Sequence, residues 1–86
     1  ESRFSSYLIE SKDLGVIELE VKDSLVGKTI QDINIPGDFI VVAIRRMQGV
    51  MIPEPKTVLK NKDILMGVVK VSSLQEVRER FHLGDK

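Results

Sequence analysis

Three apolar segments separated by turn residues constrain the fold of this chain most strongly. Residues 16–22 place Ile17, Leu19 and Val21 on one side of an extended backbone and charged side chains on the other, which is the pattern of a half-buried strand. Residues 39–44 form a continuous apolar run rich in β-branched side chains, as in a central strand covered on both faces. Residues 64–71 predict a further apolar strand.

Turn residues divide these segments and predict one hairpin. The sequence Met-Gln-Gly at 47–49 provides a short turn, so residues 39–52 are expected to fold back on themselves, with a partner strand that begins at residue 50. Pro53 and Pro55 end that strand, because proline cannot donate a hydrogen bond to a sheet. Gly67 is expected to mark a bulge or a close backbone approach.

Two helices are predicted between and after the strands. The first starts at residues 23–24, carries a stripe of apolar residues at four- and three-residue spacing, and ends near Asn34 because Pro36 follows. The second starts at Ser73, where Ser-Leu-Gln-Glu has the form of a capping box, and continues to Phe81. The order strand, helix, hairpin, strand, helix predicts an α+β fold with a four-stranded, mainly antiparallel sheet and two packed helices.

The N-terminal segment is expected to lie outside this domain. Residues 1–14 are mostly polar, with Phe4, Tyr7 and Leu8 spaced so that they could share a helical face. We expect residues 1–14 to be a linker or connecting helix and residues 15–86 to be the domain. A free terminus that docks on a partner is the alternative.

The charge balance and the scarcity of reactive side chains exclude several functions. Thirteen basic and thirteen acidic residues give a net charge of zero, so neither nucleic acid nor an anionic membrane is an expected partner. The chain has no cysteine and one histidine, His82, so we expect no catalytic site, no metal site and no cofactor. No run approaches the roughly 18–20 apolar residues of a membrane span, so a cytoplasmic location is expected.

The strands carry more apolar surface than two short helices can cover. The surplus predicts a patch for association, and a two-fold dimer is the simplest way to bury it. Alternation sends Arg45 and Arg46 to opposite faces, so one could contact a ligand or partner while the other pairs with Glu54 or caps the sheet edge. The residues predicted for a ligand or dimer interface are Ile35, Ile44, Arg45, Arg46 and Ile52.

In their order along the chain, these segments resemble the RCK_C (TrkA-C) family, the C-terminal regulatory domains of potassium channel and transporter gating subunits. The most specific segments are Leu-Val-Gly-Lys-Thr at 25–29, Ala-Ile-Arg-Arg at 43–46 and Pro-x-Pro-x-Thr-x-Leu at 53–59. The resemblance covers about residues 16–81. It identifies residues 15–86 as a regulatory domain with a TrkA C-terminal domain-like fold.

The resemblance also implies partners. Its members follow a nucleotide-binding Rossmann module (RCK_N or TrkA-N), usually dimerise, and in several relatives bind a small effector at the dimer interface that biases gating. We therefore expect a homodimer, an upstream Rossmann domain or subunit, a membrane potassium transporter or channel subunit, and a small effector as a candidate ligand. A pure dimerisation or assembly domain without a ligand is the alternative function.

Two departures from the family pattern bear on these expectations. Relatives that bind cyclic di-AMP tend to carry an arginine after the position of Ile35 and a histidine after the hairpin turn. This chain has Pro36 and no histidine before His82, which argues against that ligand. The glycine usual before Asp63 is replaced by Lys62 in a predicted surface turn.

Overall fold

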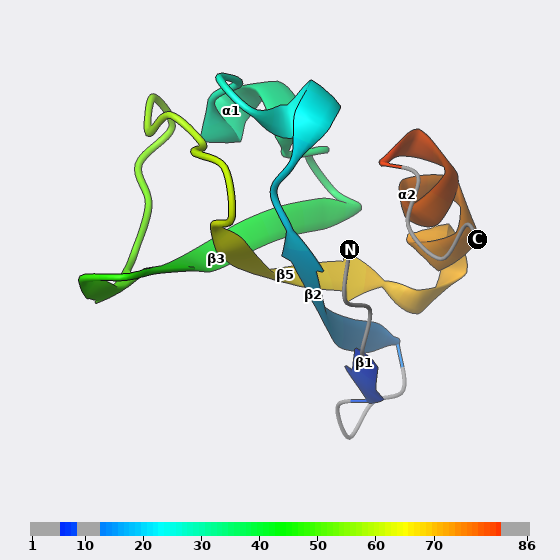
Figure 1. Ribbon diagram of the computed structural model, residues 1–86. Helices are drawn as coiled ribbons and strands as arrows, with labels where there is room; N and C mark the ends of the chain where they lie inside the picture. The colour runs from blue at the N-terminus through cyan, green and yellow to red at the C-terminus, as the bar shows by residue number, and fades with distance from the viewer. Residues whose placement is uncertain (1–5, 9–12, 82–86) are drawn as a thin grey trace.

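A computed structural model describes residues 6–8 and 13–81 and contains one antiparallel sheet of five strands in the order β1-β2-β5-β3-β4 (Figure 1). Short helices lie between and after the strands. The strands are β1 (Ser6–Leu8), β2 (Leu14–Glu20), β3 (Phe39–Arg46), β4 (Gly49–Met51) and β5 (Ile64–Lys70). The helices are α1 (Ile30–Ile33), α2 (Leu74–Arg80) and two single 3₁₀ turns at Asp23–Leu25 and Val71–Ser73.

The predicted α+β class is confirmed, and the four predicted strands are β2, β3, β4 and β5. The fifth strand, β1, pairs with β2. A helix in the N-terminal segment is therefore wrong over Ser6–Leu8, which are extended. Residues 1–5 and 9–12 of that segment lie outside the described part of the chain, and the domain boundary at residue 15 stays a prediction.

The first predicted helix is wrong in length, because an extended segment interrupts it. After the 3₁₀ turn, Val26 is extended and Gly27 has a φ of +90°, a conformation that side chains rarely adopt. Thr29 then forms a β-bridge with Val58, so only the last turn, α1, is α-helical. The bridge ties this segment to the loop at 52–63 as part of the covering layer.

One face of the sheet carries the hydrophobic core. The core side chains come from alternate positions of β2, β3 and β5 and from the segments that cover them. They are Ile17, Leu19, Val21, Leu25, Ile30, Ile33, Phe39, Val41, Ile44, Leu59, Leu65, Val69 and Val77. Figure 1 shows α1 and the loop at 52–63 together on one side of the sheet, with α2 beyond the end of β5. Burial of these groups, at about 25 cal/mol per Å² of apolar area, is the main stabilising contribution.

Gly67 permits a close contact inside this core, as its position in an apolar strand predicts. A Cβ atom there would lie 2.5 Å from a ring carbon of Phe39. The Phe39 ring in turn packs against Phe81, with 5.6 Å between the ring centroids. The contact between Phe39 and Phe81 packs the end of α2 against the sheet. It requires glycine at residue 67, because any side chain there would occupy the space of the Phe39 ring.

A β-bulge lies in β3 opposite this glycine. Val41 pairs with Gly67 and Ala43 pairs with the adjacent Met66, so Val42 is the extra residue. A bulge changes which face the following residues point to. Phe39 and Val41 face the core before it, whereas Ile44 faces the core after it.

Candidate functional site

The face of the sheet opposite the core is the candidate site, and we call it the outer face. Its side chains form four rows across the strands, given by the strand register: Leu14–Lys70; Val16–Val68–Ile40; Glu18–Met66–Ala43; and Glu20–Ile64–Arg45–Val50. Large apolar side chains are uncovered there, including Ile40 at 52%, Met66 at 39% and Val50 at 69% exposure. An apolar face of this kind indicates an interaction surface.

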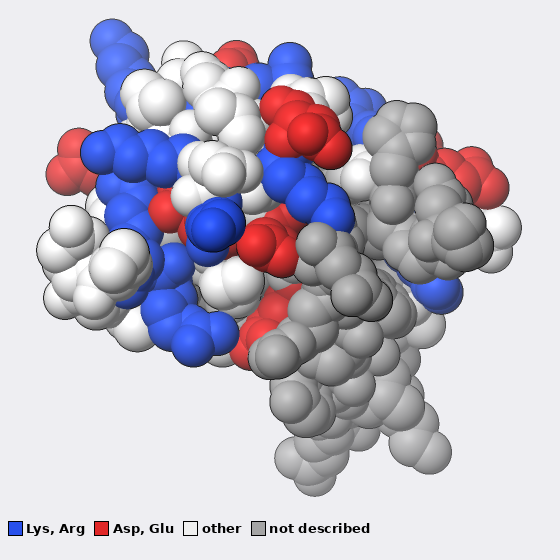
Figure 2. All heavy atoms as spheres, in the orientation of Figure 1, with Lys and Arg blue, Asp and Glu red and all other residues white. Residues whose placement is uncertain are grey.

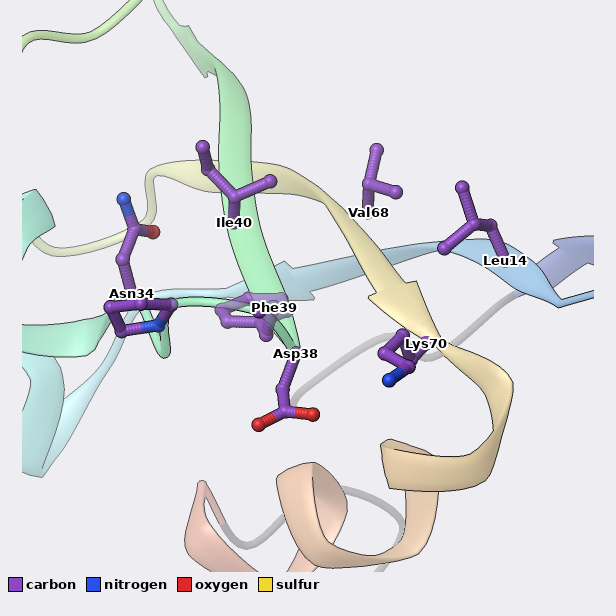
Figure 3. Close-up of a pocket in the computed structure, with 9 residues that line it drawn as sticks. Leu14, Asn34, Asp38, Phe39, Ile40, Val68 and Lys70 are labelled. Atoms are coloured by element: carbon purple, nitrogen blue, oxygen red, sulfur yellow. The ribbon is translucent and has the colours of Figure 1, made fainter.

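A cavity of about 380 Å³ occupies one end of the outer face. Ile40, Val68 and Leu14, from β3, β5 and β2, point to the same side of the sheet and form its apolar part, as Figure 3 shows. Asn34 and the turn that follows it lie beside β3, on the side away from β5. The cavity is therefore built from three separate stretches of the chain.

The polar side chains at this cavity are held by hydrogen bonds within the domain. The Asn34 side-chain oxygen accepts a hydrogen bond from the Val41 amide at 2.9 Å. The Ser73 hydroxyl donates to the Asp38 carboxylate at 2.7 Å. Lys70 supplies the cationic side chain of the lining. Because these contacts are already made, the cavity is preformed, with an apolar floor and a small polar rim.

The opposite end of the outer face carries a smaller hollow and a projecting hairpin. The hollow, of about 140 Å³, lies between Glu18, Arg45 and Met66 and reaches Val50 on β4. Beyond it, the β3–β4 hairpin extends away from α2 (Figure 1). Met47 is fully exposed at its turn, and Ile52 after β4 is 79% exposed. This end of the face is therefore apolar and protruding where the other end is apolar and concave.

The two arginines lie on opposite faces, as the alternation predicts. Arg45 is exposed on the outer face. Arg46 turns toward the core side, where its Nε donates to the Asp63 carboxylate at 2.9 Å and its guanidinium donates to the Val58 carbonyl at 2.6 Å. Its ion-pair partner is Asp63 and not the Glu54 considered from the sequence. Arg46 is a structural residue of the loop that precedes β5.

The three predicted isoleucines take different places. Ile44 is completely buried, so the prediction that it contacts a ligand or partner is wrong; the bulge at Val42 turns it into the core. Ile35 is half-buried against the core, and its amide and carbonyl both bond to Phe39. Ile52 is exposed beside the hairpin. Of the predicted set, Arg45 and Ile52 are thus the accessible side chains.

None of the residues that line the cavity was predicted as a site residue. Leu14, Val68 and Lys70 come from β2 and β5, and only the strand register shows that they are neighbours of Ile40. A signal was present, because β2 and β5 both carry apolar residues at positions that alternation assigns to the solvent side. Two strands with apolar residues on both faces indicate a sheet that is covered on both faces.

The surface charge is mixed. Figure 2 shows Lys and Arg side chains gathered mostly on the side where the hairpin lies, with acidic side chains among them. Within residues 6–8 and 13–81, no group of three or more acidic, histidine or cysteine side chains is arranged to hold a metal ion. In the same residues, no helix has the length and hydrophobicity needed to cross a membrane.

Comparisons with known proteins agree with this architecture. Two Trk system potassium uptake protein TrkA homologs are similar: that of Archaeoglobus fulgidus is 32% identical over 86% of this chain and 17% of its own length. That of Methanothermobacter thermautotrophicus is 30% identical over 80% of this chain and 32% of its own length. The chain therefore spans between about a sixth and a third of these relatives.

A solved structure shows the same fold. The crystal structure of the GsuK RCK domain superposes with a TM-score of 0.72 and 21% sequence identity, and the match covers 98% of this chain and 19% of that one. The sequence model of the TrkA-C domain matches residues 16–82, which contain β2 from its third residue, all later elements to α2, the core and nearly all of the outer face. This chain belongs to the TrkA-C domain family.

Proposed function

We propose that this domain regulates a potassium-uptake system by dimerising through its outer face and by binding a small effector there. The relatives are named as potassium uptake proteins of the Trk system, and the proposed role is regulatory and not enzymatic. The observation that carries the proposal is the apolar row of half-buried Val16 and Val68 and exposed Ile40 beside a preformed cavity.

The proposed partners follow from the family and from the length of the relatives. An upstream Rossmann (RCK_N or TrkA-N) domain or subunit and a membrane potassium transporter or channel subunit would supply the nucleotide site and the ion path. The domain would then act in the cytoplasm at the periphery of the transporter. Effector occupancy would change gating through a coupling free energy of about 1–3 kcal/mol, the usual range for linked sites.

The size of the outer face sets the expected strength of the dimer. The twelve residues of the four rows, with strands about 4.8 Å apart and rows about 6.8 Å apart, cover roughly 400 Å² per copy. A standard stable interface buries about 800 Å² per partner. The isolated domain should therefore dimerise weakly, and its dimer should form over an accessible range of protein concentration.

Light scattering of the wild type and two lysine variants tests the dimer. Met66→Lys places a charge in the centre of the outer face and should leave a monomer with an unchanged circular dichroism spectrum. Val26→Lys, at a side chain 44% exposed in the covering layer, should dimerise like the wild type. A wild type that stays monomeric at every concentration, or a Met66→Lys dimer as strong as the wild type, contradicts the proposal.

A ligand screen separates regulation from assembly alone. Nucleotides and small organic anions and cations are added to the dimer, and the thermal midpoint and molar mass are measured together. An effector should raise the midpoint, and Ile40→Asp at the cavity should remove the rise. A dimer that no compound stabilises would favour the alternative of a pure assembly domain, which the internally bonded Asn34 and Asp38 side chains also fit.

A further inference from the structure

The β3–β4 hairpin and the loop that follows it form one end of the molecule, which is both apolar and basic (Figure 1). We call residues 45–62 the hairpin end. We infer that the hairpin end docks on the anionic surface of a lipid bilayer, with the hairpin turn entering the headgroup region. This inference goes beyond the proposed function and does not depend on the proposed dimer.

The first observation is the apolar tip of the hairpin. Met47 is fully exposed at the turn, Ile52 is 79% exposed and Val50 is 69% exposed. Uncovered apolar side chains on a protruding hairpin indicate a contact with an apolar partner or phase. Met47 lies beyond the last row of the outer face, because that row ends with the pair of Arg45 and Val50. A dimer through the outer face therefore leaves Met47 uncovered.

The second observation is the charge around this tip. Residues 45–62 contain five basic side chains and one acidic side chain, whereas the whole chain is neutral. Arg46 is paired with Asp63. The exposed cations are Arg45, Lys56, Lys60 and Lys62. Figure 2 shows Lys and Arg side chains on both sides of the uncharged atoms at this end of the molecule.

The distribution of charge changes what the net charge of zero predicts for a membrane. The excess of cations at the hairpin end is balanced by an excess of acidic side chains in the rest of the chain. A neutral molecule with this asymmetry turns its basic end toward a negative surface. The attraction acts over about one Debye length, roughly 10 Å at 0.1 M salt, so the distant acidic groups oppose it weakly.

Hydrogen bonds hold the tip and the loop in a fixed arrangement. The Arg46 Nε donates to the Asp63 carboxylate at 2.9 Å, and the Arg46 guanidinium donates to the Val58 carbonyl at 2.6 Å. Within the loop, the Glu54 amide donates to the Thr57 hydroxyl at 2.9 Å. The apolar tip and the cations are therefore presented together, and little ordering is needed when they bind a surface.

A bilayer fits this end better than a protein strand does. The edge strand β4 has three residues, and Pro53 and Pro55 after it cannot donate hydrogen bonds to an added strand. The loop cations are lysines, which act as point charges on flexible stems, whereas the rigid fork of Arg46 is used inside the domain. At the boundary of a membrane, apolar groups enter the headgroup region while cations contact lipid phosphates.

Co-sedimentation of the 86-residue chain with vesicles tests the inference. Vesicles of phosphatidylcholine with about one third phosphatidylglycerol are compared with vesicles of phosphatidylcholine alone. At about 0.1 M salt, the chain should bind the anionic vesicles at least tenfold more strongly than the neutral ones. At about 1 M salt, where the Debye length is roughly 3 Å, this binding should be lost. Equal binding to both kinds of vesicle, or binding to neither, overturns the inference.

Matched double variants assign the binding to the hairpin end. Lys56→Gln with Lys60→Gln should weaken binding to anionic vesicles about 25-fold, because each basic side chain near such a surface contributes about fivefold. Lys70→Gln with Arg80→Gln removes two exposed cations elsewhere and should weaken binding less than about threefold. All four positions are exposed, so the circular dichroism spectra should match the wild type. Equal losses in the two double variants overturn the inference.

A second matched pair tests the apolar tip. Met47→Ser should weaken binding to anionic vesicles about tenfold, because a large apolar side chain no longer leaves water. Val71→Ser, at a side chain 37% exposed after β5, should bind like the wild type. Binding by Met47→Ser as strong as that of the wild type means that the turn does not enter the membrane, and overturns the inference.

A dye on a single cysteine shows which end meets the membrane, since the natural chain has no cysteine. Gln48→Cys at the hairpin turn and Gln75→Cys on α2 are each labelled with a polarity-sensitive dye. Anionic vesicles should shift the emission of the dye at residue 48 to the blue and leave that at residue 75 unchanged. The same shift at both positions, or a shift at residue 75 alone, overturns the inference. Binding to polyglutamate but not to vesicles also overturns it, because that result indicates an acidic protein as the partner.

Discussion

Arg46 and Asp63 hold the end of β3 against the loop that precedes β5. Asp63 is 3% exposed and accepts hydrogen bonds from the Arg46 Nε and from the Lys60 amide, both at 2.9 Å. Asp63→Ala leaves a largely buried guanidinium and an amide without their acceptor. We expect it to lower the free energy of unfolding by about 3 kcal/mol.

Urea unfolding of Asp63→Ala checks this value, and Glu54→Gln is the matched control. Glu54 is an exposed acid in the same loop, so its substitution should change the free energy of unfolding by less than about 0.5 kcal/mol. Equal losses in the two variants would show that net charge, and not the Arg46 contact, governs the stability of this loop.

Lys62 occupies a backbone conformation that suits glycine. Its φ is +74°, which costs a residue with an ordinary side chain about 1–2 kcal/mol. Glycine removes this strain, but it also increases the conformational freedom of the unfolded chain, which offsets part of the gain in stability. Lys62→Gly should therefore raise the free energy of unfolding by about 0.5–1 kcal/mol. Asn61→Gly, at a neighbour with negative φ, should give no gain, and a gain there would contradict the explanation.

At the scale of elements, α1 is a single turn that depends on its cap. The Asp32 carboxylate accepts a hydrogen bond from the Thr29 backbone amide at 2.9 Å. This bond, with a smaller contribution from nearby Lys28, lowers the pKa of Asp32 below its usual range. A lowered pKa in the folded state means that the cap stabilises the domain above the ordinary carboxyl pKa and loses that effect as the pH falls through the folded value.

Asp32→Asn tests the cap through its pH dependence. At pH 7 the variant should unfold at a slightly lower temperature than the wild type. Below about pH 4, the ordinary range of a carboxyl pKa, the difference should shrink and then vanish as Asp32 becomes protonated in the folded protein. A difference that stays constant from pH 7 to pH 2 would mean that the carboxylate charge plays no part.

The contact between β5 and α2 depends on Gly67. Gly67→Ala would drive a methyl group into the Phe39 ring, and the ring is confined by Phe81 on its other side. Overpacking of this kind costs about 1–3 kcal/mol. Chemical unfolding should show that loss in the wild-type background and a smaller loss with Phe39→Leu, which leaves space; equal losses would place the strain in the backbone.

The four main strands could be predicted because each has a strong local pattern. The face of the sheet to which each side chain points could not be predicted throughout. Alternation along residues 16–22 follows from burial of one face. The bulge at Val42 has no marker in the sequence, so the burial of Ile44 was missed. The cavity was missed for a different reason: Leu14, Ile40 and Lys70 become neighbours only through the pairing of β2 and β3 with β5.

At the scale of the whole molecule, weak dimerisation predicts that stability depends on concentration. A protein that unfolds from a dimer gains stability by mass action, so its thermal midpoint should rise by a few degrees for each tenfold increase in concentration. Differential scanning calorimetry measures this directly. Met66→Lys, a monomer in the proposal, should show a constant midpoint, and a wild type with a constant midpoint would contradict it.

The strand order has a consequence for synthesis of the chain. β5 is the last of the described strands to be made, yet β2 and β3 each pair with it and not with one another. As the chain leaves the ribosome, the β1–β2 and β3–β4 hairpins are the parts of the described sheet that can close early. The apolar faces of β2 and β3 stay exposed until residue 70 emerges and β5 joins the two hairpins, so a chaperone that shields them would act in this interval.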